Sequence, residues 1–221
     1  MRNVRWAGGA VAVLLGMLVA GCIGPIILGV IGSGVAGSAT RDVGGYSMIE
    51  MRGVARLEVT IGPAQPVEIT GDDNIVPLVE TVVDNGTLVV RDTTLIHPTL
   101  PLVVKVTVPD VSRLLIVSAA DAVITGVNNA ALTIDISGVG RVSVSGQTQS
   151  LTVNVTGTGH VSAEDLTAAA ATVFLAGTGR VDVTAVNTLD VTIIGAGLVT
   201  YAGSPTISQI ITGLGSLQQR S

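Results

Sequence analysis

The sequence predicts an all-β protein, in which a right-handed parallel β-helix (a solenoid) follows a β-rich N-terminal part that contains a hairpin. Hydrophobic residues make up 48% of the 221 residues and aromatic residues only 2%. The apolar content is therefore mainly Val, Ile, Leu and Ala, a composition typical of strands stacked on one another. Apolar and polar residues alternate with a period of two, and a Gly-x-Gly step recurs at nearly even spacing along the second half of the chain.

Residues 1–21 have the pattern of an export signal. Arg2 and Arg5 precede the uncharged run from Trp6 to Ala20, which is short for a membrane span. The run leads into Leu18-Val19-Ala20-Gly21-Cys22, which resembles the bacterial lipobox. The resemblance implies diacylglycerol transfer to the Cys22 thiol, cleavage before Cys22 and acylation of the new amino group. A membrane is thus the first expected partner.

Two further observations bear on export. Cys22 is the only cysteine, and a secreted protein rarely keeps one free thiol. Ile23 rather than Asp follows it, which predicts transport to the outer membrane by analogy with lipoprotein sorting in general. Loss of Arg2 and Arg5 changes the net charge from −5 to −7, which argues against a nucleic-acid partner.

The mature chain is expected to have three parts. Residues 22–39 are apolar and glycine-rich and would form a lipidated tether that lies against the membrane or the body of the protein. Residues 40–217 would form the β domain, with regular repeats from about residue 113. Residues 218–221 would form a C-terminal tail.

The N-terminal part of the β domain reads as strands without a regular period. Asp84-Asn85-Gly86 lies between the apolar runs Val79–Val83 and Thr87–Val90, which is a strong hairpin signal. Leu102–Val108 is a further strand that Pro109 closes.

The repeats determine the rest of the fold. Positions six, four and two residues before each glycine step are mostly aliphatic, as in Leu151, Val153 and Val155, so they face the interior of one coil per repeat. Right-handed crossovers between parallel strands are strongly preferred, which predicts the hand. The glycines suit a corner that requires a positive φ or a close backbone approach. Ala119 and Asp121 lie nineteen residues before Gly138 and Gly140 and predict a degenerate sixth coil. The glycines of the five steps are Gly138 and Gly140, Gly157 and Gly159, Gly177 and Gly179, Gly195 and Gly197, and Gly213 and Gly215.

An ordered set of motifs resembles a known family. It comprises Arg41-Asp42-Val43-Gly44-Gly45-Tyr46, Thr70-Gly71-Asp72-Asp73-Asn74, Asp84–Leu88, Val106-Thr107-Val108-Pro109, the glycine steps, and Tyr201-Ala202-Gly203-Ser204-Pro205. Together they resemble, over roughly residues 40–217, the GIN domain, the head domain of proteins classed as auto-transporter adhesins and of many bacterial lipoproteins. The resemblance implies a β-helical protein of the cell envelope that acts as a non-enzymatic scaffold or adhesion-type binding module, with an undefined ligand.

One departure from the family suggests a candidate site. The family often has an acidic residue directly after the glycine step, where this chain is expected to have Ala122, Arg141, His160, Arg180, Leu198 and Ser216. Three stacked coils would thus carry a column of Arg141, His160 and Arg180. The column is either a solvated edge neutralised by neighbours such as Asp182 or Asp165, or a site for an anionic partner such as an acidic glycan.

Two other features could contact partners. Asp135, Asn154, Phe174 and Thr192 should form an outward column, in which Phe174 is either an ordinary exposed apolar residue or a binding residue. Only Gln218 to Ser221 follow the last repeat, so subunits could also pair through the ends of the solenoid.

The sequence predicts no cofactor, no metal and no enzymatic activity. A calcium-binding β-roll requires an aspartate after each glycine step, and a zinc site requires several Cys or His ligands. His160 and His97, which is expected in a loop, are the only histidines. Asp182 and Glu164 lie near the steps, but no carboxylate pair recurs at hydrolase spacing. The alternative function is a polysaccharide-active enzyme or an acidic-glycan-binding protein on a β-helix.

Overall fold

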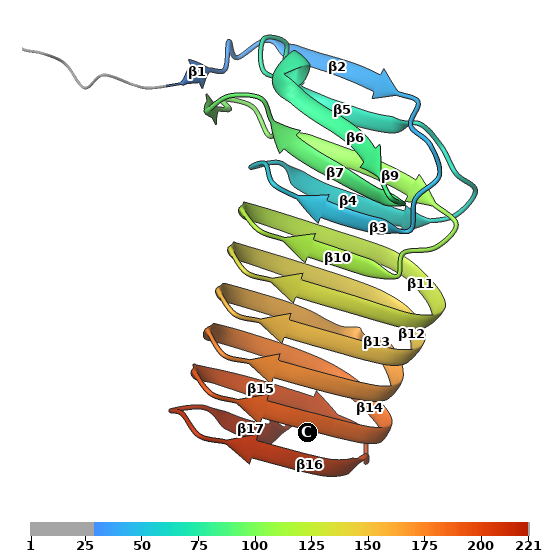
Figure 1. Cartoon of the computed structure of the whole chain (residues 1–221), viewed down its shortest axis with the longest axis vertical. Helices are drawn as coiled ribbons and strands as arrows, with labels where there is room; N and C mark the ends of the chain where they lie inside the picture. Colours follow the sequence, from blue (N-terminus) through green and yellow to red (C-terminus); the bar gives the residue numbers. More distant parts are fainter. Residues whose placement is uncertain (1–28, 221) are drawn as a thin grey trace, which may run out of the picture.

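The computed structural model describes residues 29–220. The predicted signal peptide 1–21, Cys22 and the start of the tether lie outside the described residues. A 15-stranded sheet winds into a right-handed β-solenoid, as predicted, and a separate pair of short strands lies beside its N-terminal end (Figure 1).

Four long strands each wrap around one full coil of the solenoid. These strands are β11 (Ala119–Ile136), β12 (Val139–Val155), β13 (Thr158–Leu175) and β14 (Thr178–Ile193). Neighbouring coils pair in parallel, so that Leu132, Leu151, Ala171 and Leu189 stack in register and are buried in the core. This stacking confirms the predicted repeat, with the alternating aliphatic residues inside and polar residues outside.

The glycine steps are explained by close packing of backbones. The second glycines, Gly140, Gly159, Gly179 and Gly197, stack in register at one edge of the solenoid. A Cβ atom on Gly177 would overlap the carbonyl oxygen of Gly157 in the coil before it. None of the ten step glycines has a positive φ. Close approach, rather than a left-handed conformation, therefore requires glycine at these positions.

Three shorter strands follow β14: the first two complete one coil, and the third begins the next. β15 (Ala196–Ala202) pairs with β14, and so does β16 (Thr206–Ile211), whereas β17 (Ser216–Gln219) pairs with β15. The expected tail boundary at residue 218 thus falls inside β17. Among the described residues, β16 pairs only with β14 and β17 only with β15, so no strand covers their outer edges.

The N-terminal part contains a coil that is out of sequence order. β3 (Met48–Met51) and β4 (Arg56–Ile61) form a coil that lies between two coils from later in the chain. On one side it pairs with β7 (Thr87–Asp92) and β9 (Val103–Val108), and on the other with β10 (Arg113–Ile116) and β11. After β3 and β4 the chain therefore forms β7 and β9 on one side of the inserted coil. It then crosses to the other side, where β10 leads into the regular repeats.

Antiparallel strands close the N-terminal end. β5 (Val67–Asp72) pairs antiparallel with β2 (Ala36–Arg41) and β9, and β6 (Val79–Asp84) pairs antiparallel with β7. The β6–β7 turn has positive φ at Asn85 and Gly86, the arrangement of a type I′ hairpin, and this confirms the predicted hairpin. The short 3₁₀ helix η1 (Val76–Leu78) lies between β5 and β6.

The folded body begins earlier than residue 40. β2 starts at Ala36, and β1 (Val30–Ile31) pairs in parallel with β8 (Ile96–His97). The described end of the expected tether is therefore part of the body. His97, expected in a loop, lies in a short strand instead.

A buried carboxylate holds these N-terminal segments together. The side chain of Asp72 has no exposed surface and accepts backbone N–H bonds from Gly34 (2.7 Å), Thr99 (2.9 Å) and Leu100 (3.0 Å). Burial alone would raise the pKa of Asp72, but these N–H bonds outweigh it and lower the pKa below the usual aspartate value.

Candidate functional site

A shallow groove of about 610 Å³ runs along the edge of the solenoid where the glycine steps lie. Because glycines stack at this edge, the groove floor is backbone, and side chains rise only along its two sides. One side carries the residues between the glycines, among them Val139 and Thr158, both exposed. The other side carries Arg56, Asp121, Arg141, His160 and Arg180. Five successive coils contribute, so the groove extends roughly 19 Å at about 4.8 Å per coil.

The predicted basic column is present in the groove wall. Arg141 pairs in register with His160, and His160 with Arg180, so the three side chains project from successive coils. Arg141 is the most exposed of them, at 68% of its side-chain surface. The structure thus brings the three residues together, while their role in binding stays a prediction.

The start of this column differs from the sequence-based prediction. Ala120 pairs with Gly140 and Asp121 with Arg141, because the coil before Gly140 has twenty residues rather than nineteen. Asp121 was expected opposite Gly140 and is instead opposite Arg141. Ala122 was expected at the head of the column and is instead buried in the core. The column therefore begins with an acidic residue, Asp121.

Arg56 is a member of the groove that sequence reasoning missed. It comes from the inserted coil, one position before Leu57, which pairs with Ala122. It therefore stands next to Asp121 on the groove wall, although the two are far apart in the sequence. No periodic signal could have placed it there, because residues 62–112 interrupt the repeat.

Asp182 provides the counter-charge at the Arg180 end of the column. It is one of the two residues predicted from the sequence as neutralising neighbours. It is 4% exposed and accepts two bonds from Arg180 Nε, at 2.9 Å and 2.8 Å. His160 Nε2 lies 3.2 Å from its Oδ2, and the Thr200 hydroxyl donates to its Oδ1. Burial would raise the pKa of Asp182, but the bonds from Arg180, Thr200 and His160 lower it below the usual value.

The remaining groove arginines are more weakly compensated. Arg56 Nε lies 3.2 Å from Glu58 Oε1, on an exposed surface. The Arg141 guanidinium is 4.0 Å from Asp121, whose other oxygen accepts the Arg141 backbone N–H at 3.1 Å. Arg141 therefore has free hydrogen-bonding capacity directed at solvent, because a single contact at 4.0 Å leaves most of its donors available.

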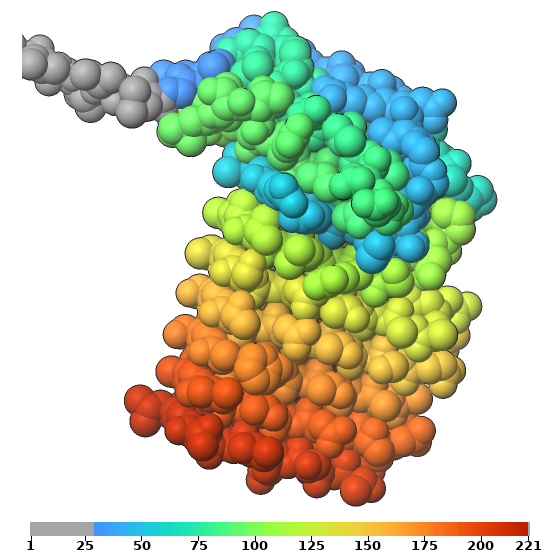
Figure 2. Space-filling model, viewed as in Figure 1, coloured from blue at the N-terminus to red at the C-terminus, as the bar shows by residue number. Residues whose placement is uncertain are grey.

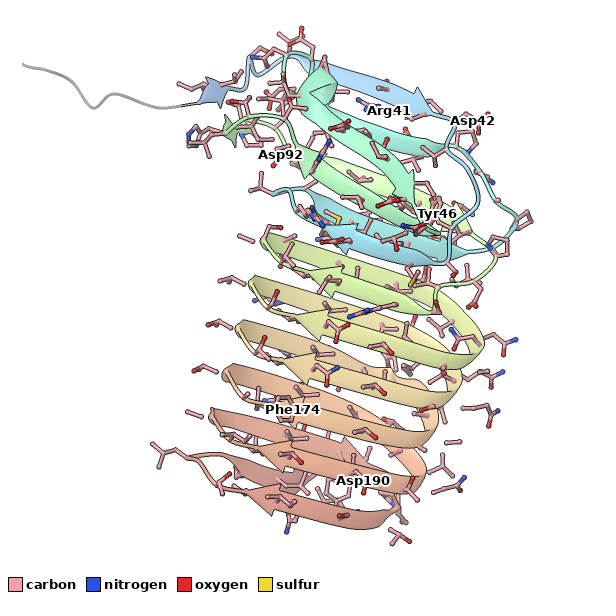
Figure 3. The ribbon with its side chains drawn as sticks, in the orientation of Figure 1. Arg41, Asp42, Tyr46, Asp92, Phe174 and Asp190 are labelled. Atoms are coloured by element: carbon pink, nitrogen blue, oxygen red, sulfur yellow. The ribbon has the colours of Figure 1, made fainter. Side chains whose placement is uncertain are left out.

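Phe174 lies on another face of the solenoid and does not line the groove. It stands between Asn154 and Thr192 in the predicted outward column that starts with Asp135, and it is half-buried. Figure 3 shows Phe174 and Asp190 on strands of the same face. The structure therefore does not bring Phe174 together with the basic column.

Buried polar atoms without a partner occur in the N-terminal part. Among the described residues they are Tyr46 Oη, Thr81 Oγ1 and Asp92 Oδ1, and Figure 3 places Tyr46 and Asp92 in that part of the fold. Burial raises the pKa of Tyr46 to about 12 and also raises the pKa of Asp92. Tyr46 and Thr81 are not among the residues that line the groove, whereas the other carboxylate oxygen of Asp92 accepts the backbone N–H of the groove residue Val54 at 3.0 Å. No pattern in the sequence indicated these atoms.

Neither a metal site nor a spanning helix stands out in residues 29–220. No group of three or more His, Cys, Asp or Glu side chains there could hold a metal ion. No helix in that range is long and apolar enough to cross a membrane.

The family assignment rests on the sequence pattern and the fold together. The family described as "Putative auto-transporter adhesin, head GIN domain" matches residues 45–205. The chain belongs to the GIN-domain family. The match covers the inserted coil, the hairpin and the repeats up to β15, so it includes every residue of the groove.

Solved structures show the same fold as this GIN domain. One is described as a "putative adhesin" from Bacteroides fragilis, with a TM-score of 0.71 and 22% identity, covering 87% of this chain and 100% of the other. Another is described as a "putative lipid binding protein" from Parabacteroides distasonis, with a TM-score of 0.52 and 20% identity, covering 87% of this chain and 99% of the other. At these identities the likeness establishes the fold. No curated protein matched the chain.

Proposed function

We propose that this protein is a lipid-anchored, non-enzymatic binding module of the bacterial cell envelope, and that it holds an acidic polysaccharide chain in the groove along its glycine steps. The observation that carries the proposal is the continuity of the groove over five coils. A flat, repeating surface of this kind suits an extended partner better than a small molecule.

The chemistry of the groove wall supports an anionic partner. Arg56, Arg141 and Arg180 present guanidinium groups from different coils, and each remains about half exposed or more. Guanidinium groups bind carboxylates and sulfates through paired hydrogen bonds. Because Asp182 already compensates Arg180, we expect Arg141 and Arg56 to contribute most of the binding.

Three observations support a binding module of the envelope. The lipobox-like segment that ends at Cys22 supports anchoring, and Ile23 supports the outer membrane. The family description and the name of the Bacteroides fragilis protein support adhesion. Asp121 in the groove accepts the backbone N–H of Arg141, and Asp182 behind the groove wall accepts two bonds from Arg180, so both carboxylates stabilise the wall.

Binding is tested on the full chain with alginate as the acidic probe and dextran as the neutral one. We expect binding to alginate that weakens with added salt, and no binding to dextran. Arg141→Gln should weaken binding on the order of tenfold, in line with the loss of one or two charge-assisted hydrogen bonds. Arg91→Gln is the matched control, because Arg91 is similarly exposed but pairs with Glu80 on β6, outside the groove. Equal binding by the two variants would contradict the proposed site.

Anchoring and orientation are tested on intact cells that carry an epitope tag after Ser221, with Cys22→Ala as the control. We expect external protease to remove the tag without lysis of the cells, and the control protein to leave the membrane fraction. Protection of the tag until the outer membrane is breached would contradict the adhesion role and favour a periplasmic scaffold.

A further inference from the structure

The C-terminal coil leaves the interior of the solenoid uncovered. Ile207 and Ile211 stack in register on Leu189 and Ile193, which have no exposed surface. Yet Ile207 is 37% exposed and Ile211 38%, because the described residues place no coil beneath them. β16 and β17 each pair on one side only, so their other edges present unpaired backbone N–H and C=O groups.

The sequence of this coil lacks the usual protection of a free strand edge. Natural edge strands carry charges, prolines or bulges that prevent pairing with another chain. Residues 201–219 contain no charged residue at all, and Pro205 lies before β16 rather than within it. The nearest charge in the sequence, Arg220, pairs with Glu164 on β13, three coils back, so it is directed away from the open edge.

The opposite end of the solenoid is protected in the ways that the C-terminal coil is not. There the antiparallel strands β2 and β6 form the outer edges, and they carry Arg41, Glu80 and Asp84. Figure 2 shows these N-terminal strands at one end of the molecule and the uncharged coil at the other. Among residues 29–220 only the C-terminal end is open, so its unpaired backbone groups can be satisfied by the same end of a second copy but not by the protected end.

We propose that two copies of this chain pack end to end through their C-terminal coils. A two-fold axis across the end of the solenoid places β16 and β17 of one copy antiparallel to the same strands of the other, which satisfies the free backbone groups. Ile207, Ile211 and Leu217 of each copy then cover those of its partner. The pair is closed, so a dimer and not a filament forms. This inference goes beyond the binding role of the groove and does not depend on it.

The oligomeric state of the full chain in mild detergent tests the proposal. We expect sedimentation velocity to show a concentration-dependent dimer. Gln209 lies between Ile207 and Ile211 on the interior side of β16 and is exposed, so Gln209→Lys places two like charges at the interface at little cost to the fold. This variant should remain monomeric at concentrations at least tenfold above the wild-type dimerisation midpoint. Gln147→Lys, at an exposed position on an inner coil, is the matched control and should dimerise as the wild type does.

A distance measurement distinguishes the proposed pairing from other dimers. In a Cys22→Ser background the chain has a single introduced cysteine, which can carry a spin label. A label at Gln218→Cys should give a short label-to-label distance in the dimer, whereas one at Asp73→Cys, beside β5, should give none. Thermal unfolding verifies that each variant is folded. A monomeric wild type, dimerisation of Gln209→Lys, or a short distance from the Asp73→Cys label would overturn the proposal.

Discussion

The two ends of this solenoid differ in whether strands cover the apolar interior. At the N-terminal end the chain leaves the repeat, reverses direction and covers the core with antiparallel strands that Asp72 ties together. At the C-terminal end the described residues continue the repeat, and the interior column stays in register as far as β16. A repeating sequence therefore specifies how a solenoid extends, whereas its termination requires residues that break the repeat.

The largest expected difference between the ends concerns the core. Ile116 and Ile211 lie in the same interior column, but Ile116 is fully buried between coils. Ile116→Ala should lower the free energy of unfolding by about 2–5 kcal/mol, because it leaves a cavity. Ile211→Ala should cost less than about 1 kcal/mol in dilute, monomeric protein, because its side chain is already partly solvated. Chemical denaturation measures both, and similar losses would show that the C-terminal coil is as well packed as the middle.

The glycine steps should be the next most sensitive positions. Gly177→Ala would force the backbones of two coils apart, since the added methyl group meets the Gly157 carbonyl. We expect a loss of about 1–3 kcal/mol, as for other overpacked sites. Gly44→Ala, in the connection before β3, has nothing within 4 Å of the new atom and should change stability by less than about 0.5 kcal/mol. Denaturation midpoints of the two variants provide the comparison.

Acid should destabilise the strands that cover the N-terminal end of the solenoid. The folded pKa of Asp72 is lowered, so its carboxylate stabilises the fold fully above the unfolded pKa of about 3.9, and this contribution is lost as the pH falls through the folded value. Asp72→Asn should lower the melting temperature at pH 7 and flatten its decline below about pH 4. At low pH the backbone amides of β2 and β5 in the wild-type protein should exchange their hydrogens before those of the regular coils. Unchanged exchange there would mean that other contacts hold the cap.

The smallest effect is expected at Tyr46, next to the inserted coil. Burial raises its pKa to about 12 and leaves its hydroxyl without a partner. Because the unfolded phenol ionises near pH 10, the fold should lose stability as the pH rises from about 10 towards 12. Tyr46→Phe should be nearly neutral at pH 7 and should reduce this alkaline loss. Melting curves from pH 7 to 11.5 provide the measurement, and identical alkaline slopes would contradict it.

The regular coils were predictable because their signal is local. Each repeat contains its own interior face and its own glycine step, so position along the chain translates directly into position in the stack. The hairpin at Asn85-Gly86 was predictable for the same reason, since its turn chemistry lies within two residues.

The inserted coil and part of the groove could not be predicted. β4 pairs with β11 across a long stretch of sequence, and no periodicity links the two. For this reason the site predicted from the sequence did not include Arg56. The register of Asp121 was missed because one coil is a residue longer than its neighbour, and a slip of one residue exchanges inward and outward positions. The stacking of Arg141, His160 and Arg180 could be predicted because those coils retain their glycine steps.

The parallel register of the coils also has a mechanical consequence. The backbone hydrogen bonds that join β11, β12, β13 and β14 point along the long axis of the solenoid. In the proposed lipid-anchored protein, a tensile force between the N-terminus and a load at the opposite end would stretch these bonds directly and detach coils one after another from the loaded end. Each detached coil would release a similar length of chain, so the molecule would yield in even steps and absorb work gradually instead of failing at once.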